Sequence, residues 1–200
     1  MNEKFFDLQR EKQDRIINAA IKIFAQNGYK HASTDVIVKE AGISKGLLFH
    51  YFSSKSGLYS FLFDYSVKYM LFEYSRAISA DEKDYFNIRK AMEGAKLNVL
   101  RNYPFMSQFI DCGMTETQAD VVDSIADAKN TYAKAMDKYL SQGKTEALQP
   151  AVNKTTLENL IRFTVDGLTN DQMQADSYQP EILYEQITMY LDILRDITKK

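Results

Sequence analysis

Residues 34–52 read TDVIVKEAGISKGLLFHYF. Two short stretches with helical patterning, 34–41 and 45–52, are separated only by Gly42, Ile43 and Ser44. Glycine ends helices because it accepts the left-handed backbone conformation, and serine is a preferred N-cap for the helix that follows. The stretch therefore predicts a helix, a tight turn and a second helix, which together make a helix-turn-helix unit.

A longer amphipathic helix precedes this unit. Ile17, Ala20, Ile21 and Phe24 recur at the spacing of one helical face, and we expect their helix to run from about residue 2 to residue 27. A glycine follows directly and predicts the end of that helix. Three helices in the first 58 residues are enough to bury a small core.

The rest of the chain is also predicted to be helical. With 8 glycines and 3 prolines in 200 residues, sharp turns are too few for an all-β sandwich. Residues 142–153 look most like a loop, and we find no strand-like alternation or repeat. The expected fold is all-α with about nine helices, of which the later ones span about 54–78, 85–102, 105–112, 117–141, 154–172 and 180–198.

Composition excludes several classes of protein. Hydrophobic residues make up 45% and charged residues 26%, as in an ordinary globular chain. One cysteine excludes an internal disulfide and a multi-cysteine zinc site, and two histidines argue against a histidine-based metal site. No apolar run has the length of a signal peptide or a membrane span. We expect a soluble, cytoplasmic protein that does not enter a membrane.

Charge divides the chain unevenly. Residues 1–58 carry nine Lys and Arg against six Asp and Glu, a net charge of +3, and the remainder carries −5. A basic head on an acidic body is expected when only the head meets nucleic acid. An excess of three charges also fits an ordinary solvated surface, so charge alone decides nothing.

The second helix of the predicted unit has two distinct faces. At 100° per residue, Leu48 and Phe52 face the first two helices, whereas Gly46, Leu47 and an N-terminal Lys45 face outward. A recognition helix presents its N-terminal residues to base edges in the major groove. Lysine donates to guanine, and leucine packs on a thymine methyl group. Taken singly, each of these residues also fits an ordinary surface position.

Residues 42–55, GISKGLLFHYFSSK, together with INAA at 17–20 and FAQNGY at 24–29, resemble the tetracycline-repressor (TetR) family of bacterial regulators. The resemblance covers about the first 58 residues and departs at Phe49, where the family usually has tyrosine. It implies a DNA-binding domain over 1–58 and a ligand-binding and dimerisation domain over 59–200. The expected DNA contacts are Ser33, Thr34, Ser44, Lys45, Gly46, Leu47, Phe49, His50, Tyr51 and Lys55.

Aromatic residues are concentrated beyond residue 58, where 18 of the 25 Phe and Tyr residues occur. Small-molecule pockets are mostly apolar with a few polar groups, and the resemblance places the family's pocket among the middle helices. Plain core packing is the alternative for these aromatic stripes. The ligand-binding candidates are Phe61, Tyr65, Tyr69, Phe72, Tyr103, Phe105, Met106, Phe109, Phe163 and Asp166.

The last two helices suggest self-association. The final helix carries a second apolar side, formed by Ile182, Met189 and Ile193, beyond what one core-facing stripe requires. The resemblance implies a four-helix bundle across a two-fold axis, and the alternative is burial within one chain. The expected interface residues are Leu157, Ile161, Val165, Leu168, Leu183, Ile187, Tyr190, Leu191 and Leu194.

These observations predict a homodimeric repressor that binds a palindromic operator in double-stranded DNA and is released by a small, largely apolar effector. The alternative is a helical ligand-binding or scaffolding protein that does not bind DNA. Catalytic Cys-His or Ser-His-Asp spacings and phosphate-cradling loops are missing from the sequence. We therefore expect neither an enzyme nor a bound cofactor or metal.

Overall fold

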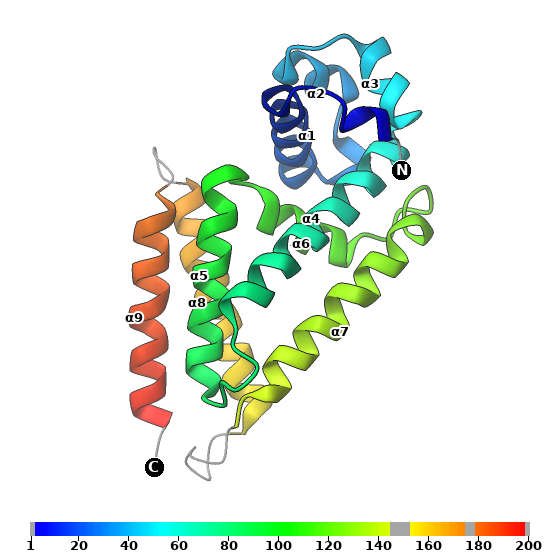
Figure 1. Ribbon diagram of the computed structural model, residues 1–200. Helices are drawn as coiled ribbons and strands as arrows, with labels where there is room; N and C mark the ends of the chain where they lie inside the picture. The colour runs from blue at the N-terminus through cyan, green and yellow to red at the C-terminus, as the bar shows by residue number, and fades with distance from the viewer. Residues whose placement is uncertain (1–2, 145–152, 175–178, 199–200) are drawn as a thin grey trace. The chain divides into compact units, whose positions relative to one another are not determined.

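The computed structural model describes residues 3–144, 153–174 and 179–198 (Figure 1). Over these residues it holds helices and one isolated β-bridge between Asp84 and Lys144, and no strand, so the all-α prediction is confirmed. The elements are η1 (Glu3–Phe5), α1 (Arg10–His31), α2 (Thr34–Ala41), α3 (Lys45–Phe52), α4 (Lys55–Ala77), α5 (Tyr85–Asn102), α6 (Met106–Thr115), η2 (Asp123–Ile125), α7 (Ala126–Gln142), α8 (Lys154–Gln174) and α9 (Pro180–Thr198).

The chain folds into two compact units. The first comprises Met1–Leu71 with Asn102–Ala133, and the second comprises Phe72–Arg101 with Lys134–Lys200. The divide falls inside α4 and inside α7, so each of these helices contributes to both units. This division follows packing; the functional division at residue 58 stays a prediction.

The helix-turn-helix has the predicted bounds, α2 and α3 being separated by three residues. Gly42 takes the left-handed conformation (φ 64°, ψ 42°) and ends α2, as its lack of a side chain allows. The Ser44 hydroxyl then accepts a hydrogen bond from the Leu47 amide at 3.2 Å and caps α3. Leu48 and Phe52 are buried, which confirms the inward face predicted for α3.

The junction between α3 and α4 depends on a close approach of the backbone. A Cβ atom on Gly57 would lie 2.1 Å from the Phe52 carbonyl oxygen, so no other residue fits there without movement of the chain. The Gly57 amide donates to the Ser54 hydroxyl at 2.9 Å, which completes the first turn of α4. The first turn of α4 is thereby fixed against the end of α3.

Two helix boundaries differ from the prediction. The first helix starts at Arg10 rather than near residue 2, because the chain before it forms the short turn η1 with Phe5 fully buried. Gly28 kinks α1 (φ 66°, ψ 172°), and helical structure resumes to His31. The helix expected over 117–141 begins only at Ala126, after turns and η2. The helical spacing of apolar residues continues into these turns, so the sequence pattern does not show where the helices begin.

The first unit has an aromatic core. Phe24 of α1, Tyr59 and Phe63 of α4, and Phe109 of α6 are all fully buried, with ring centroids 4.9 Å apart for Phe24 and Tyr59 and 5.1 Å apart for Tyr59 and Phe109. Burial of such rings contributes a large share of folding energy. This core fixes α4 and α6 against α1, the helix that supports the helix-turn-helix.

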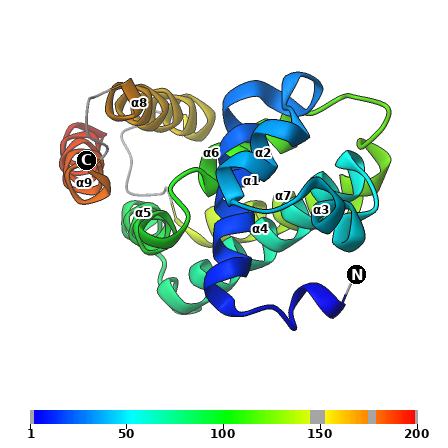
Figure 2. The same ribbon diagram turned by 90° about the horizontal axis from the view of Figure 1, so that it is seen from above.

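The second unit is built on α8 and α9, which lie side by side in both views (Figures 1 and 2). Leu157 and Ile161 of α8 and Leu183 and Ile187 of α9 pack with Tyr85 of α5 in one buried cluster. On the opposite side of α9, Ile182, Met189, Ile193 and Ile197 are exposed.

No helix in the described part of the chain is long and apolar enough to cross a membrane.

Candidate functional site

The exposed face of α3 is the first candidate site. Lys45, Gly46 and His50 are exposed, and Leu47 is half-buried. A Cβ atom on Gly46 would meet no protein atom within 4 Å, so the surface there is open to a close partner. The structure therefore brings the predicted N-terminal residues of α3 together on one accessible surface.

Lys45 is held by a carboxylate that the sequence analysis missed. Its Nζ lies 2.9 Å from Asp35 Oδ1 and donates to Asp35 Oδ2 at 3.1 Å, which joins the first turns of α2 and α3. Both side chains are at least half exposed, so this ion pair is weak in water. A phosphate group that binds Lys45 would replace the Asp35 carboxylate as its partner. The negative charge of Asp35 would then repel that phosphate group.

Lys55 has a different environment. Its Nζ donates to the Lys30 carbonyl oxygen at 3.2 Å and lies 4.7 Å from the centre of the Tyr29 ring. Burial lowers the pKa of Lys55, whereas the nearby Asp120 carboxylate acts in the opposite direction. The predicted phosphate contact is thus a lysine fixed between the end of α1 and the start of α4.

The remaining predicted DNA contacts fall around these two lysines. Ser33 is exposed and stands at the N-cap of α2, but its side chain makes no capping bond there. Thr34, the first residue of α2, is half-buried, as are Phe49 and Tyr51. The Tyr51 ring packs edge-on against Phe5, with centroids 5.8 Å apart. The segment before α1 therefore supports the C-terminal end of α3.

The predicted ligand residues separate into three groups. Phe61, Tyr65, Tyr69 and Tyr103 form one aromatic group in the first unit, with ring centroids 6.2 Å apart for Phe61 and Tyr65 and 5.2 Å apart for Tyr69 and Tyr103. Met106 and Phe109 are fully buried, Phe109 within the aromatic core, and Phe105 is half-buried. The other three candidates lie on the second unit.

Those three candidates are exposed rather than gathered around a pocket. Phe72 is 57% and Phe163 62% exposed, and Asp166 is exposed and pairs with Arg162 at 3.7 Å. The same Arg162 covers the Phe163 ring at 4.3 Å from its centre. These three side chains point to solvent in the single chain, and their role in ligand binding stays a prediction.

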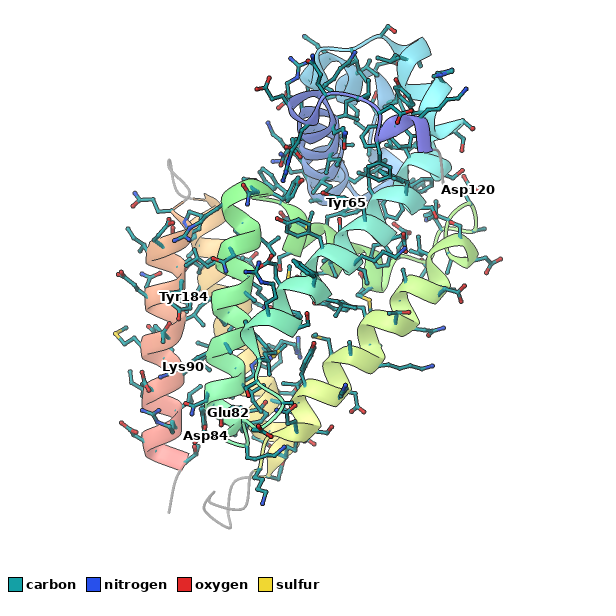
Figure 3. All side chains as sticks on the ribbon, viewed as in Figure 1. Tyr65, Glu82, Asp84, Lys90, Asp120 and Tyr184 are labelled. Atoms are coloured by element: carbon teal, nitrogen blue, oxygen red, sulfur yellow. The ribbon has the colours of Figure 1, made fainter. Side chains whose placement is uncertain are left out.

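A hydrogen-bond chain connects the aromatic group to α1. The hydroxyl groups of Tyr65 and Tyr103 lie 2.9 Å apart, and the Tyr103 hydroxyl donates to Asp14 Oδ1 at 2.7 Å. Burial raises the pKa of both tyrosines, so their hydroxyls stay protonated at neutral pH. Figure 3 shows Tyr65 on α4, the helix that follows the helix-turn-helix.

Seven of the nine predicted interface residues are buried in the single chain, and the role of all nine at an interface stays a prediction. Leu157, Ile161, Val165, Leu183, Ile187, Leu191 and Leu194 are buried within a single chain, where α8, α9 and α5 pack together. Leu168 packs against the same cluster, and Tyr190 is exposed. The apolar side of α9 that contains Leu183 and Leu191 is therefore buried in the core of the single chain. The second apolar side of α9, which contains Met189 and Ile193, is exposed.

An exposed α3, capped by Ser44 and packed on α2, defines a helix-turn-helix unit of the kind that DNA-binding proteins use. A sequence model of the family described as "Bacterial regulatory proteins, tetR family" matches residues 16–60, the same three helices and the start of α4. The N-terminal region of this chain is therefore similar to the corresponding region of TetR family regulators.

Individual relatives resemble mainly this N-terminal region. The chain is 46% identical over 55 residues to the HTH-type transcriptional regulator UidR of Escherichia coli strain K12, a match that covers 26% of this chain and 28% of UidR. It is 23% identical over 159 residues to the negative transcriptional regulator IcaR of the biofilm operon icaADBC in Staphylococcus aureus, covering 78% of this chain and 81% of IcaR. The chain thus spans only 19–28% of the length of the first relatives that it matches.

The fold of the whole chain is similar to that of solved TetR family regulators. A crystal structure of a TetR family transcriptional regulator from Chloroflexus aurantiacus matches with a TM-score of 0.67 and 19% sequence identity, over 99% of this chain and 98% of that one. At this identity the likeness establishes the fold and not the ligand.

Proposed function

We propose that this protein is a homodimeric transcriptional repressor that binds a palindromic operator and is released from it by a small, largely apolar molecule. Such a regulator acts in the cytoplasm, where bacterial chromosomal DNA lies. The observation that carries the proposal is the open surface at the start of α3, where Lys45 and Gly46 are exposed on a helix capped by Ser44.

The chemistry of this surface fits direct reading of bases. Lysine at the first turn of a recognition helix donates to guanine O6 or N7, and Leu47 offers an apolar contact to a thymine methyl group. Gly46 lets the backbone approach the groove, because no protein atom would surround a side chain there. Lys55, Ser33, Thr34 and the groups at the end of α3 supply contacts to the phosphates, which position the helix without reading sequence.

A dimer supplies the second copy of this surface. Ile182, Met189, Ile193 and Ile197 are spaced by seven, four and four residues along α9 and are all exposed, so they share one apolar face. Pairing of this face across a two-fold axis buries it. Two recognition helices then meet half-sites about one helical turn, roughly 34–36 Å, apart.

Release by a ligand requires a link from the sensing helices to α3. The hydrogen bonds from Tyr65 to Tyr103 and on to Asp14 connect α4 with α1, next to the aromatic group of predicted ligand residues. A ligand that binds more tightly when α4 has moved shifts the population toward the released state, by the difference in its two affinities. Couplings of this kind are typically about 1–3 kcal/mol.

The test is a mobility-shift titration of the full chain against the DNA upstream of its own gene, with a shuffled duplex of equal length as the reference. The wild-type protein is expected to prefer the upstream DNA. Lys45→Ala is expected to weaken this binding by about 1–3 kcal/mol while leaving dimerisation intact, because Lys45 is a base contact. Lys68→Ala is the matched control, since Lys68 is an exposed lysine paired with Asp64 on α4.

Equal affinity for both duplexes would reject sequence-specific binding. No binding to either duplex at low salt would favour the alternative, a ligand-binding or scaffolding protein without DNA binding. If Lys45→Ala and Lys68→Ala weaken binding to the same small extent, the lysine on α3 is not a base contact.

A further inference from the structure

The ion pair between Asp35 and Lys45 presents a hydrogen-bond acceptor and a donor side by side. Lys45 Nζ lies 2.9 Å from Asp35 Oδ1 and 3.1 Å from Oδ2. The side chain of Lys45 is 50% exposed and that of Asp35 is 70% exposed, so a partner in solution can reach both. The first turns of α2 and α3 therefore offer a donor and an acceptor together, where the lysine alone would offer only donors.

Both members of the pair keep hydrogen-bonding capacity for a further partner. An ammonium group has three N–H donors, and at most two of them point to the two oxygens of Asp35. A carboxylate has roughly four lone-pair sites, of which one lysine occupies only some. A Cβ atom on Gly46, the residue after Lys45, would meet no protein atom within 4 Å, so a flat edge of DNA bases can come close. The pair can thus bind a further donor and acceptor while it stays intact.

A second lysine–carboxylate pair in the same unit provides a contrast. Near the other end of α2, Lys22 Nζ donates to Glu40 Oε1 at 2.6 Å and joins α1 to α2. Its side chains are also partly exposed, 38% for Lys22 and 44% for Glu40. That pair holds α2 on its supporting helix, whereas the pair of Asp35 and Lys45 connects the first turns of the helix-turn-helix. The two pairs share their chemistry and differ in position.

The edge of a guanine–cytosine base pair carries the complementary pattern in the major groove. Guanine presents the acceptors N7 and O6, and the N4 amino donor of cytosine comes next to O6. A Watson–Crick hydrogen bond joins O6 to N4, so these atoms are about 2.9 Å apart. Lys45 Nζ and Asp35 Oδ1 are separated by the same 2.9 Å. A lysine over N7 and O6 with a carboxylate over N4 therefore matches each donor to an acceptor.

An adenine–thymine base pair fits less well in either orientation. Its groove edge presents an acceptor, a donor and an acceptor, from adenine N7 through adenine N6 to thymine O4. A carboxylate on the N6 donor lies between two acceptors, and the lysine covers only one of them. The other acceptor repels the carboxylate. In a guanine–cytosine pair the donor stands at one end of the pattern, so the carboxylate meets no second acceptor.

We propose that Asp35 is a specificity-determining residue, which accepts a hydrogen bond from cytosine N4 while Lys45 donates to the guanine of the same base pair. The two residues together select one guanine–cytosine pair in each half-site of the operator. Lysine alone donates to acceptors of either kind of base pair, and the carboxylate adds the discrimination against adenine–thymine. This inference rests on the proposed function, because it names a base pair within the operator.

The test replaces each base pair of the half-site in turn by the other three and measures affinity for the full chain by mobility shift. At one symmetric position, the wild-type protein is expected to bind guanine–cytosine about tenfold more tightly than adenine–thymine. Asp35→Ala is expected to lose most of this preference. Asp35→Asn is expected to retain it, because asparagine keeps an oxygen acceptor. Glu40→Ala removes the carboxylate of the other pair and is the control with unchanged preference.

A modified base isolates the contact with cytosine. N4-methylcytosine still pairs with guanine, but a methyl group takes the place of the N–H that faces the major groove. With this base at the preferred position, wild-type affinity is expected to fall about tenfold. The affinity of Asp35→Ala is expected to change by less than about twofold, because that variant has no acceptor for the lost donor.

Three results would overturn the inference while specific binding by the wild type leaves the proposed function standing. The first is an operator in which no position requires guanine–cytosine. The second is an unchanged base preference of Asp35→Ala. The third is an equal loss of affinity for the wild type and Asp35→Ala on the methylated duplex, because the methyl group then obstructs the protein without the carboxylate. A wild type with no sequence preference rejects the proposed function and this inference together.

Discussion

Helices α3 and α9 both carry apolar residues at helical spacing, yet the chain uses them differently. In α3 only Leu48 and Phe52 are buried, and the opposite side presents polar groups and a glycine to solvent. In α9 two apolar sides compete, and the single chain buries the one that contains Leu191 while leaving Ile193 49% exposed. A helix with one apolar side can bury only that side. In a helix with two apolar sides, packing against the neighbouring helices decides which side is buried.

The largest expected effect concerns the buried side of α9. Leu191→Ala is expected to lower the free energy of unfolding by about 3 kcal/mol, because it removes a core side chain that is 2% exposed and leaves a cavity. Ile193→Ala, its neighbour on the exposed side, is expected to change it by about 0.5 kcal/mol or less in the monomer. Urea unfolding at several protein concentrations measures both. Equal losses at every concentration would place both residues in the core.

The second prediction concerns the exposed side of α9. Ile193→Asp places a charge in the middle of the proposed interface and is expected to shift the protein to monomers in sedimentation velocity at micromolar concentration. Operator affinity is expected to fall at least tenfold, since one recognition helix no longer positions the other. Lys138→Asp, on the exposed surface of α7, is the control and is expected to leave the dimer intact. A stable dimer of the Ile193 variant would move the interface elsewhere.

A smaller effect is expected at Lys55. If Lys55 contacts a phosphate, Lys55→Ala is expected to weaken binding to all duplexes alike. It is also expected to reduce the magnitude of the slope of log affinity against log salt concentration by about 1. Lys45→Ala instead acts mainly on the specific duplex. Mobility shifts at four salt concentrations distinguish the two lysines. An unchanged salt slope for Lys55→Ala would show that Lys55 contacts no phosphate and interacts only within the protein, with Tyr29 and the Lys30 carbonyl oxygen.

The smallest expected effect is at Asp35. Asp35→Asn frees Lys45 from its ion pair and removes a negative charge beside the groove, so affinity for DNA is expected to rise by about 0.2–1 kcal/mol. The gain is expected to be as large on the shuffled duplex as on the operator, because charge carries no sequence information. Lower affinity of the variant would show that Asp35 holds Lys45 in the geometry needed for binding.

The sequence allowed the bounds of the helix-turn-helix to be predicted residue by residue, whereas its contacts with DNA stay a prediction. Gly42 and Ser44 end one helix and begin the next through their own backbone and side-chain properties, which depend on few neighbours. It did not predict the pairing of Lys45 with Asp35, because that pair depends on which side chains meet across a turn. The ligand residues were predicted only in part, since aromatic stripes look alike in a core and in a pocket.

Local chemistry alone, then, determined that this chain is helical, that it opens with a helix-turn-helix, and which face of α3 turns inward. Turn residues and a single apolar stripe act over a few neighbouring positions, so their effect can be read along the chain. Tertiary packing alone decided which side of α9 is buried and that Phe163 and Asp166 face solvent. These outcomes depend on contacts between distant segments, and periodicity within one helix carries no information about its neighbours.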